Sequence, residues 1–502
     1  MPAKPIMLQG TGSDVGKSVL SAALCRIFLQ DGYSVAPFKS QNMALNSFVT
    51  EDGGEMGRAQ VAQAQACRLK PSVLMNPILL KPVTDVGAQV IVKGNSIGNM
   101  SVEEYFDFKL SEAIPIVKEC YDELAAEYDI IVIEGAGSPA EINLRDSDIV
   151  NMRMAELVNS PVILIGDIDK GGVFASLVGT LILLEPHESE RIKGFLINKF
   201  RGRKSLLDSG LMMIEQRCGK PFLGVIPFFK DIKIPDEDSV ALKQKKPDNF
   251  TADTVNIEVL LLPHISNFTD FDPFEEEPDV RLRYVPPTDE ISNPDVLIIP
   301  GSKNTMGDLK WLKATVHAKR IAELTAEGKT IIGICGGYQM LGKTVRDTTG
   351  VESESGAVDG LGLLDVETIF KPQKQTFQVE AVELETKLQI RGYEIHQGET
   401  QLSSCVLPLC KIQLRGGKPT KIIDGAKNPS KNIWGTYIHG IFDADEYRRA
   451  FIDQQRIKKG MPPLEEIQYR YDQDAEYDKL ADVVRENIQL DLIYDIFMKR
   501  KT

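Results

Sequence analysis

The sequence lacks long hydrophobic runs and has no excess of basic charge. None of its apolar stretches approaches the ~20 residues needed to cross a bilayer, so we expect no membrane-spanning helix. The formal net charge is -14, which argues against nonspecific binding to nucleic acid, because phosphates require basic residues for neutralisation. A local group of lysines or arginines could still hold an acidic small substrate.

Cysteine is scarce and shows no pairing pattern. The seven cysteines are an odd number, are widely scattered and include no C-x-x-C pair, which argues against a disulfide framework and a structural zinc site. The first ten residues, MPAKPIMLQG, run directly into a strand and a glycine loop, without the long apolar region of a signal peptide. We therefore expect a cytoplasmic protein.

The length of 502 residues exceeds what one hydrophobic core usually supports. Repeated strand and helix units indicate parallel sheets with helices on both faces. We predict an α/β fold with two doubly wound domains, mainly parallel sheets and a helical C-terminal tail. The predicted boundaries are a first domain at 1–235, a linker at 236–254, a second domain at 255–460 and a helical extension at 461–502.

The first motif, GTGSDVGKS, lies between a short apolar segment and an amphipathic helix. This context is typical of a P-loop, in which backbone N–H groups face phosphate, Lys17 reaches the outer oxygens and Ser18 binds magnesium. The spacing departs from the strict P-loop rule, since five residues separate the two flanking glycines instead of four, but it resembles the variant loop of dethiobiotin synthetase-like ATP enzymes. We predict that the nucleotide is bound by Gly10, Thr11, Gly12, Val15, Gly16, Lys17 and Ser18.

A magnesium site is expected near this loop. The segment DIIVIEGAG reads as a buried strand that ends in the carboxylate of Glu134, which can hold magnesium on the nucleotide phosphates. Ser18, Glu134 and Glu55 are the predicted magnesium contacts. Asn198, at the end of a later strand, is predicted to contact the adenine, with a turn-capping role as the alternative.

The segment TIIGICGGYQMLG predicts a buried strand, a tight turn and a helix, with Cys335 in the turn. A thiol raised from the backbone in this way is a candidate nucleophile, although most single cysteines are core residues. The pattern resembles the nucleophile elbow of class I glutamine amidotransferases. That resemblance implies that Gly301, Ser302 and Gly336 form the oxyanion and glutamine-binding site.

A cysteine nucleophile also needs a base. Of the five histidines, His439 has the context that the class I fold gives its catalytic histidine, a late strand that runs into a turn. The glutamate that usually follows two residues later is absent, so Asp443 or Glu394 replaces it or the site works as a Cys–His dyad. For His396, substrate contact and a structural role stay equally open.

Together an ATP site and a glutaminase predict one reaction class. A carboxylate is a poor electrophile, so phosphoryl transfer from ATP activates it and ammonia then displaces phosphate. The sequence therefore predicts ATP-dependent amidation of a carboxylate, with ammonia taken from glutamine.

The ordered set of motifs resembles the cobyric acid synthase family across nearly the whole chain. It includes GTGSDVGKS, KSQNMALNS, EMGRAQVAQA, EGAGSPAEINL, GDIDKGGVFAS, INKFRG, PGSKNT, GICGGYQMLG, GYEIHQG and GTYIHGIFD. The resemblance implies ATP, Mg²⁺ and L-glutamine, and a corrinoid substrate, adenosylcobyrinic acid a,c-diamide, amidated on its b, d, e and g side chains in cobalamin biosynthesis. It also implies Cys335 and His439 as the catalytic pair, and it leaves oligomerisation open.

Two alternatives stay in view. One is cobyrinic acid a,c-diamide synthase, which has the same architecture and a different regiochemistry. The other is a P-loop switch ATPase whose second domain is an inactive glutaminase that binds a partner.

Overall fold

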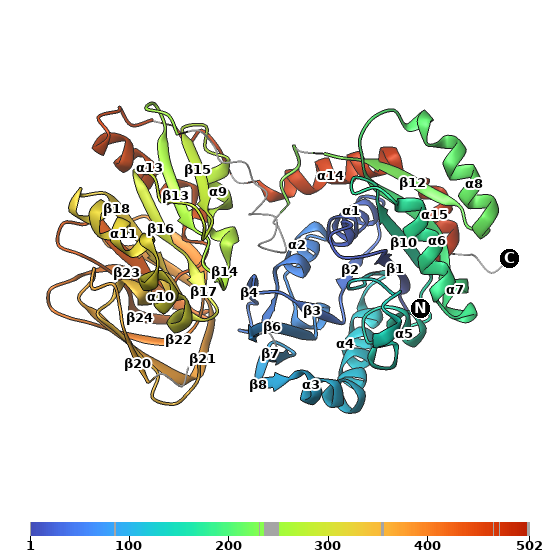
Figure 1. Ribbon diagram of the computed structural model, residues 1–502, viewed down its shortest axis with the longest axis horizontal. Helices are drawn as coiled ribbons and strands as arrows, with labels where there is room; N and C mark the ends of the chain where they lie inside the picture. Colours follow the sequence, from blue (N-terminus) through green and yellow to red (C-terminus); the bar gives the residue numbers. More distant parts are fainter. Residues whose placement is uncertain are drawn as a thin grey trace. The chain divides into compact units, whose positions relative to one another are not determined.

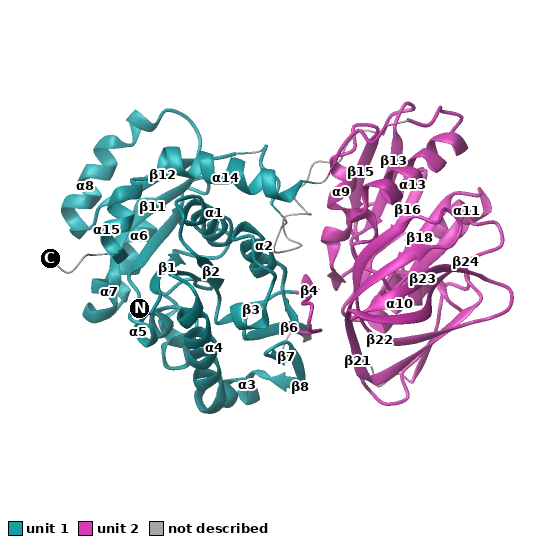
Figure 2. Ribbon diagram, turned by 180° about the vertical axis from the view of Figure 1, so that it is seen from behind, with its two compact units in different colours: residues 1–44, 55–235, 472–502 teal, residues 45–54, 236–471 magenta. Residues whose placement is uncertain are grey.

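The computed structural model forms two compact units that do not follow the chain in order (Figure 2). It describes residues 2–84, 87–229, 231–234, 250–352, 356–464, 466–470 and 472–498. The first unit consists of residues 1–44, 55–235 and 472–502, and the second of residues 45–54 and 236–471. Segment 45–54 and the C-terminal tail thus group differently from the domains expected from sequence. The linker expected at 236–254 lies mostly outside the described residues.

A six-stranded parallel sheet forms the centre of the first unit, with helices along both of its sides (Figure 1). Its strands β2 (Val35–Phe38), β9 (Ile130–Glu134) and β10 (Val162–Asp167) are buried at every position, which is why their sequences are largely apolar. In spatial order the strands are β12 (Phe222–Pro227), β11 (Ile192–Phe200), β10 (Val162–Asp167), β1 (Lys4–Gly10), β9 (Ile130–Glu134) and β2 (Val35–Phe38).

Helices and a small second sheet complete this unit. The main helices are α1 (Lys17–Gln30), α2 (Arg58–Ala66), α3 (Val102–Phe108), α4 (Ile114–Glu127), α5 (Met152–Leu157), α6 (Val173–Leu183), α7 (Pro186–Arg191) and α8 (Asp208–Cys218). The small sheet has the order β3 (Gln41–Met43), β6 (Ile78–Thr84), β7 (Gly87–Val92) and β8 (Asn95–Ser101).

The C-terminal tail is helical, as the sequence predicted, and belongs to the core of the first unit. Leu480 in α14 (Gln473–Asn487) is fully buried there, and α15 (Leu490–Met498) follows. Between the two helices, the Gln489 backbone N–H donates to the carbonyl of Leu223 at 2.7 Å. This contact covers the outer edge of β12, where unpaired backbone groups would otherwise be exposed.

The second unit is built on an 11-stranded mixed sheet. Its parallel part has the order β15 (Val280–Val285), β13 (Val255–Leu260), β16 (Val296–Ile299), β18 (Thr330–Ile334) and β25 (Ile433–Thr436). The main helices of this unit are α10 (Thr305–Ala314), α11 (Val316–Ala326), α12 (Gly336–Leu341) and α13 (Asp445–Lys458).

Long antiparallel strands extend this sheet beyond β25. They are β24 (Lys418–Lys427), β23 (Leu407–Arg415), β21 (Val366–Glu383) and β22 (Gln389–Leu402), with the short β19 (Thr344–Arg346) and β20 (Ala357–Asp359) beyond them. None of the helices that the structure describes combines the length and apolar character that a membrane span requires.

Candidate active sites

The nucleotide-type loop connects β1 to α1 in the first unit. Two of its residues have positive φ angles, Asp14 at 59° and Gly16 at 96°, so the chain turns sharply before the helix begins. The Lys17 ammonium donates to the carbonyl of Gly12 at 2.8 Å and to the carbonyl of Gly137 at 3.1 Å. Lys17 is therefore held over the loop, where its charge can meet phosphate oxygens.

Close packing fixes the backbone of this loop. A Cβ on Gly10 would lie 2.5 Å from Cγ2 of Val15, and a Cβ on Gly16 would lie 2.1 Å from Nδ2 of Asn198. Asn198 Nδ2 donates to the carbonyl of Val15 at 2.9 Å, and this hydrogen bond fixes the loop backbone just before Gly16. Its predicted contact with adenine stays a prediction.

Glu134 gathers polar side chains at the end of β9. Its Oε1 accepts hydrogen bonds from Ser18 Oγ and Lys39 Nζ, both at 2.8 Å, and its Oε2 accepts from Gln63 Nε2. Glu134 is only 1% exposed, so the lysine supplies the charge that a buried carboxylate needs. The structure thus brings together Ser18 and Glu134, which the sequence had proposed as partners.

Lys39 is a residue whose proximity to Glu134 the sequence reasoning missed. It follows strand β2, and β2 lies beside β9 with Phe38 in register with Ile133. The order of the strands would have revealed this position, because carboxyl ends of neighbouring parallel strands meet at one edge of the sheet.

Magnesium can be tested against the donor atoms present. Mg²⁺ prefers oxygen ligands and needs only one or two from protein when phosphates and water supply the others. The hydroxyl of Ser18 and the carboxylate of Glu134 are such oxygens and contact each other, so they fit this role. Glu55 forms a buried ion pair with Lys81 Nζ at 2.7 Å, and its predicted metal contact stays a prediction. No group of three His, Cys, Asp or Glu side chains suited to a metal is found in the described parts of the chain.

In the second unit, Cys335 occupies a strained turn between β18 and α12. Its φ angle is 49°, a left-handed value that is uncommon for a residue with a side chain. The backbone of the next residues is tightly enclosed, since a Cβ on Gly337 would lie 1.9 Å from the carbonyl oxygen of Ile299. The turn therefore requires glycine and presents the sulfur at the carboxyl edge of the sheet.

His439 has a carboxylate partner, Asp270. Nδ1 of His439 lies 2.6 Å from Oδ2 of Asp270, and the Gly440 N–H donates to Oδ1 at 2.9 Å. Burial alone would lower the pKa of His439, but Asp270 and a hydrogen bond to Cys335 outweigh it and raise the pKa to about 10. The three side chains form a Cys–His–Asp triad.

The orienting carboxylates proposed from sequence, Asp443 and Glu394, do not occupy this position. Oε2 of Glu394 accepts from Arg415 Nε at 2.7 Å, and Asp270 holds His439. Asp270 lies 169 residues before His439, in the segment that follows β13, so no local motif could have linked the two. A search for acids after each parallel strand would have included it.

The expected oxyanion residues also lie at this site. A Cβ on Gly336 would be 2.9 Å from the backbone nitrogen of Ser302, and a Cβ on Gly301 would be 3.3 Å from Cε1 of His439. Ser302 Oγ donates to Asp308 Oδ2 at 2.6 Å, which fixes the turn. The structure therefore brings Gly301, Ser302 and Gly336 close to Cys335 and His439, the predicted nucleophile and base.

Tyr393 packs against His439. Its ring stacks on His439 with centroids 5.3 Å apart, and the two residues exchange backbone hydrogen bonds of 3.1 and 2.9 Å. The Tyr393 hydroxyl donates to the carbonyl of Ser47 at 3.2 Å, and Asn267 Nδ2 donates to the same carbonyl at 2.9 Å. Segment 45–54 thus helps to hold Tyr393, which in turn packs against His439.

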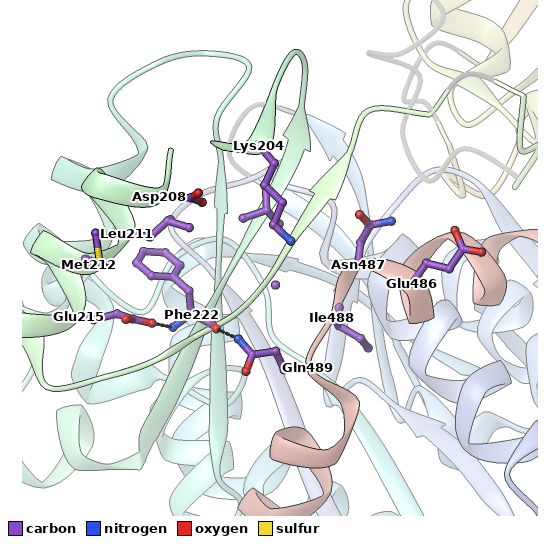
Figure 3. Close-up of a pocket in the computed structure, with 12 residues that line it drawn as sticks. Lys204, Asp208, Leu211, Met212, Glu215, Phe222, Glu486, Asn487, Ile488 and Gln489 are labelled. Carbon is purple, nitrogen blue, oxygen red and sulfur yellow. Dashed lines mark hydrogen bonds between the residues drawn. The ribbon is translucent and has the colours of Figure 1, made fainter. Parts of the chain in front are cut away.

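A surface pocket in the first unit lies apart from the predicted site residues (Figure 3). It is bordered by α8, β12, the end of α14 and the two residues between α14 and α15, and none of its lining residues belongs to the nucleotide loop. Hydrogen bonds cross its floor, from Gln489 Nε2 to the carbonyl of Phe222 at 2.9 Å and from the Phe222 N–H to Glu215 at 2.7 Å. The first bond holds the tail against the sheet, and the second holds α8 against it.

Comparisons with known proteins match both halves of the chain. Residues 6–241 match the CobQ/CobB/MinD/ParA nucleotide binding domain, and residues 256–447 match the CobB/CobQ-like glutamine amidotransferase domain. A cobyric acid synthase of Thermoanaerobacter sp. (strain X514) is 50% identical over 99% of this chain and 100% of the relative.

The chain belongs to the cobyric acid synthase family. A second family member, from Alkaliphilus metalliredigens (strain QYMF), is 52% identical over 98% of this chain and 99% of its own. A third, from Streptococcus sanguinis (strain SK36), is 50% identical over 99% of both. Like the curated family members, the chain is an amidoligase that uses glutamine. The family predicted from the motifs is thus confirmed.

Proposed function

We propose that this chain amidates the b, d, e and g side-chain carboxylates of adenosylcobyrinic acid a,c-diamide, with ATP as the activator and glutamine as the nitrogen donor. The amidation chemistry rests on the presence in one chain of a P-loop beside Glu134 and of a Cys335–His439–Asp270 triad, and the corrinoid substrate rests on membership of the cobyric acid synthase family. Each site by itself supports only half of an amidation.

In the glutaminase half, Cys335 Sγ attacks the side-chain amide carbon of glutamine. His439 carries a proton at neutral pH, because its pKa is raised to about 10, and it provides the countercharge that a thiolate requires. The backbone N–H groups of Ser302 and Gly336 stabilise the oxyanion that forms. His439 then gives its proton to the leaving ammonia, and water hydrolyses the thioester to release glutamate.

In the ligase half, the carboxylate oxygen of the corrinoid attacks the γ-phosphate of ATP and gives an acyl phosphate and ADP. Lys17 and Lys39 lie where they can stabilise the charge on the transferring group, since both contact the loop or Glu134. Magnesium, held by Ser18 and Glu134, would supply further positive charge to the phosphates. Ammonia then displaces phosphate from the acyl carbon and leaves the amide.

The proposal is tested by incubating the enzyme with ATP, magnesium, glutamine and the a,c-diamide, and by following the corrinoid by mass spectrometry. We expect successive products with one to four new amides. Amidation of cobyrinic acid itself, with none on the a,c-diamide, would assign the chain to the other regiochemistry. ATP hydrolysis without release of glutamate would instead support a switch ATPase.

A further inference from the structure

Asn267 begins the short turn that carries Asp270, the carboxylate partner of His439. The turn is η6 (Phe268–Phe271), a 3-10 helix whose four residues are all buried. The Asp270 N–H donates to the carbonyl of Asn267 at 3.1 Å. Asn267 has a φ angle of 53°, a left-handed value that asparagine and glycine adopt more readily than other residues. The backbone of Asn267 therefore helps to set where Asp270 lies.

The side chain of Asn267 reaches a second neighbour of His439, the ring of Tyr393. Nδ2 of Asn267 donates to the Tyr393 hydroxyl at 2.8 Å and to the carbonyl of Ser47 at 2.9 Å. The Tyr393 hydroxyl donates to the same carbonyl at 3.2 Å. A carbonyl can only accept, so the nitrogen of the Asn267 amide, and not its oxygen, must face Ser47. The two N–H donors of the amide thus serve these two partners.

This cluster is closed off from water and lies against the catalytic base. Asn267 is only 2% exposed, and Ser47 and Tyr393 are also buried. A buried polar group that loses its partner gains no bond to water in return, so the arrangement is costly to change. The Tyr393 ring stacks on His439 with planes 21° apart. Asn267 thus joins two elements that contact His439, η6 through its backbone and β22 through its side chain.

We propose that Asn267 is a positioning residue for the glutaminase base, and that it acts on His439 through both Asp270 and Tyr393. The inference rests on the proposed function, in which His439 serves Cys335 during the attack on glutamine. His439 has to keep its hydrogen bonds to Cys335 and to Asp270 at the same time. A displacement of about 1 Å in a catalytic group can cost about 100-fold in rate. Loss of the Asn267 amide should therefore lower kcat and leave the affinity for glutamine nearly unchanged.

The experiment replaces Asn267 by glycine and measures glutamate release by the full-length enzyme. Glycine adopts a left-handed φ angle without strain, so Asn267→Gly removes the amide and leaves the turn. We expect kcat to fall roughly 10- to 100-fold and KM to change by less than about twofold. Ammonium-driven amidation should keep the wild-type rate. The matched control is Lys387→Gly, at another left-handed residue of the second unit, and it should change neither activity.

A second measurement follows the contact between His439 and the thiol. Iodoacetamide alkylates thiolates, and the Cys335 thiolate depends on the countercharge of the protonated His439 ring. In Asn267→Gly, alkylation of Cys335 at neutral pH should slow several-fold relative to alkylation of Cys405, an exposed cysteine. Peptide mass spectrometry measures both thiols in one sample. A residue that only stabilised the fold would not change this ratio.

Two further variants test the same cluster. Asn267→Asp keeps the size of the side chain and turns an acceptor toward the Ser47 carbonyl, so it should be at least as damaging as Asn267→Gly. Tyr393→Phe removes the hydroxyl and keeps the ring, so kcat should fall less, by about 3- to 10-fold. In the double variant of Asn267→Gly and Tyr393→Phe, the loss should be smaller than the product of the single losses, because both act through one contact.

Wild-type kcat and wild-type alkylation of Cys335 in Asn267→Gly would overturn the proposal. A rise in KM alone would also overturn it, because it would indicate a contact with glutamine. If Asn267→Gly does not fold, Tyr393→Phe is decisive, and wild-type kcat in that variant would refute the role of the cluster. Failure of the proposed function is distinct, since the wild-type enzyme would then release no glutamate from glutamine.

Discussion

The two active regions reach the same end, a positioned reactive group, by different physical means. At the nucleotide loop, side-chain charges do the positioning, since Ser18 and Lys39 both bind the buried carboxylate of Glu134. At the Cys335 turn, the backbone positions the thiol: Cys335 has a left-handed φ angle, and Gly337 packs against the carbonyl of Ile299. Phosphoryl transfer needs positive charges fixed near the phosphates, whereas a cysteine nucleophile needs its sulfur held in one orientation toward the substrate.

The largest effects are expected when each site is inactivated separately. We expect Cys335→Ala to lower glutamine-dependent amidation by about 10⁴-fold or more, since it removes the nucleophile, and to leave ammonium-dependent amidation intact. Lys17→Ala should lose both activities, because activation by ATP is common to them. The measurement is corrinoid amidation with each nitrogen source. Equal loss with both sources in Cys335→Ala would mean that the sites are not separate.

The orienting acid gives the next largest effect. Asp270→Asn should lower glutamine-dependent activity about 10²- to 10⁴-fold, because an amide can hold His439 in the wrong tautomer. Ammonium-dependent amidation should not change. The matched control is Asp443→Asn, which alters a nearby acid that does not hold Nδ1 of His439. If Asp443→Asn were the more damaging of the two, the assignment of Asp270 would be wrong.

Backbone shape at the cysteine turn predicts a stability effect of several kcal/mol. Gly337→Ala places a methyl group 1.9 Å from the carbonyl oxygen of Ile299, so the turn must move. Gly179→Ala in helix α6 is the control, since a Cβ there meets no atom within 4 Å. It should stabilise by roughly 0.5–1 kcal/mol. Unfolding midpoints in urea compare them, and a well-tolerated Gly337→Ala would refute the steric account.

The remaining expected difference is a pH dependence of stability. The pKa of His439 is raised to about 10 in the folded state, above its unfolded value of about 6.5. Its stabilisation is therefore fully present below about pH 6.5 and is lost as the pH rises through about 10. The difference in unfolding free energy between wild type and His439→Gln should shrink over this range. Parallel curves for the two proteins would show that the raised pKa contributes nothing.

Local motifs predicted the local structure of both candidate sites, because each lies where a strand meets a turn. The elbow at Cys335, the strand that ends at Glu134 and the turn at Gly301 are short patterns whose meaning depends on adjacent residues. Asp270 and Lys39 were missed because each joins its partner only through the order of strands in a sheet. Strand order is a property of the whole fold, and no single segment contains it.

The fold class was also predicted, because buried parallel strands have continuous apolar sequences. The positions of segment 45–54 and of the tail were not. Ser47 is held by Tyr393 and Asn267, residues far away in sequence, and the backbone of Gln489 pairs with an edge strand. Apolar periodicity shows that a segment packs, and it does not show against which unit.

The proposed reaction begins when Cys335 forms a thioester with glutamine and releases its side-chain nitrogen as ammonia, which then becomes the nitrogen of the corrinoid amide. It is tested most directly with glutamine labelled with ¹⁵N in its side-chain amide, in the presence of unlabelled ammonium. We expect the wild-type enzyme to put ¹⁵N into the new corrinoid amides and Cys335→Ala to put in only unlabelled nitrogen. Amides without ¹⁵N from the wild-type enzyme would contradict the account.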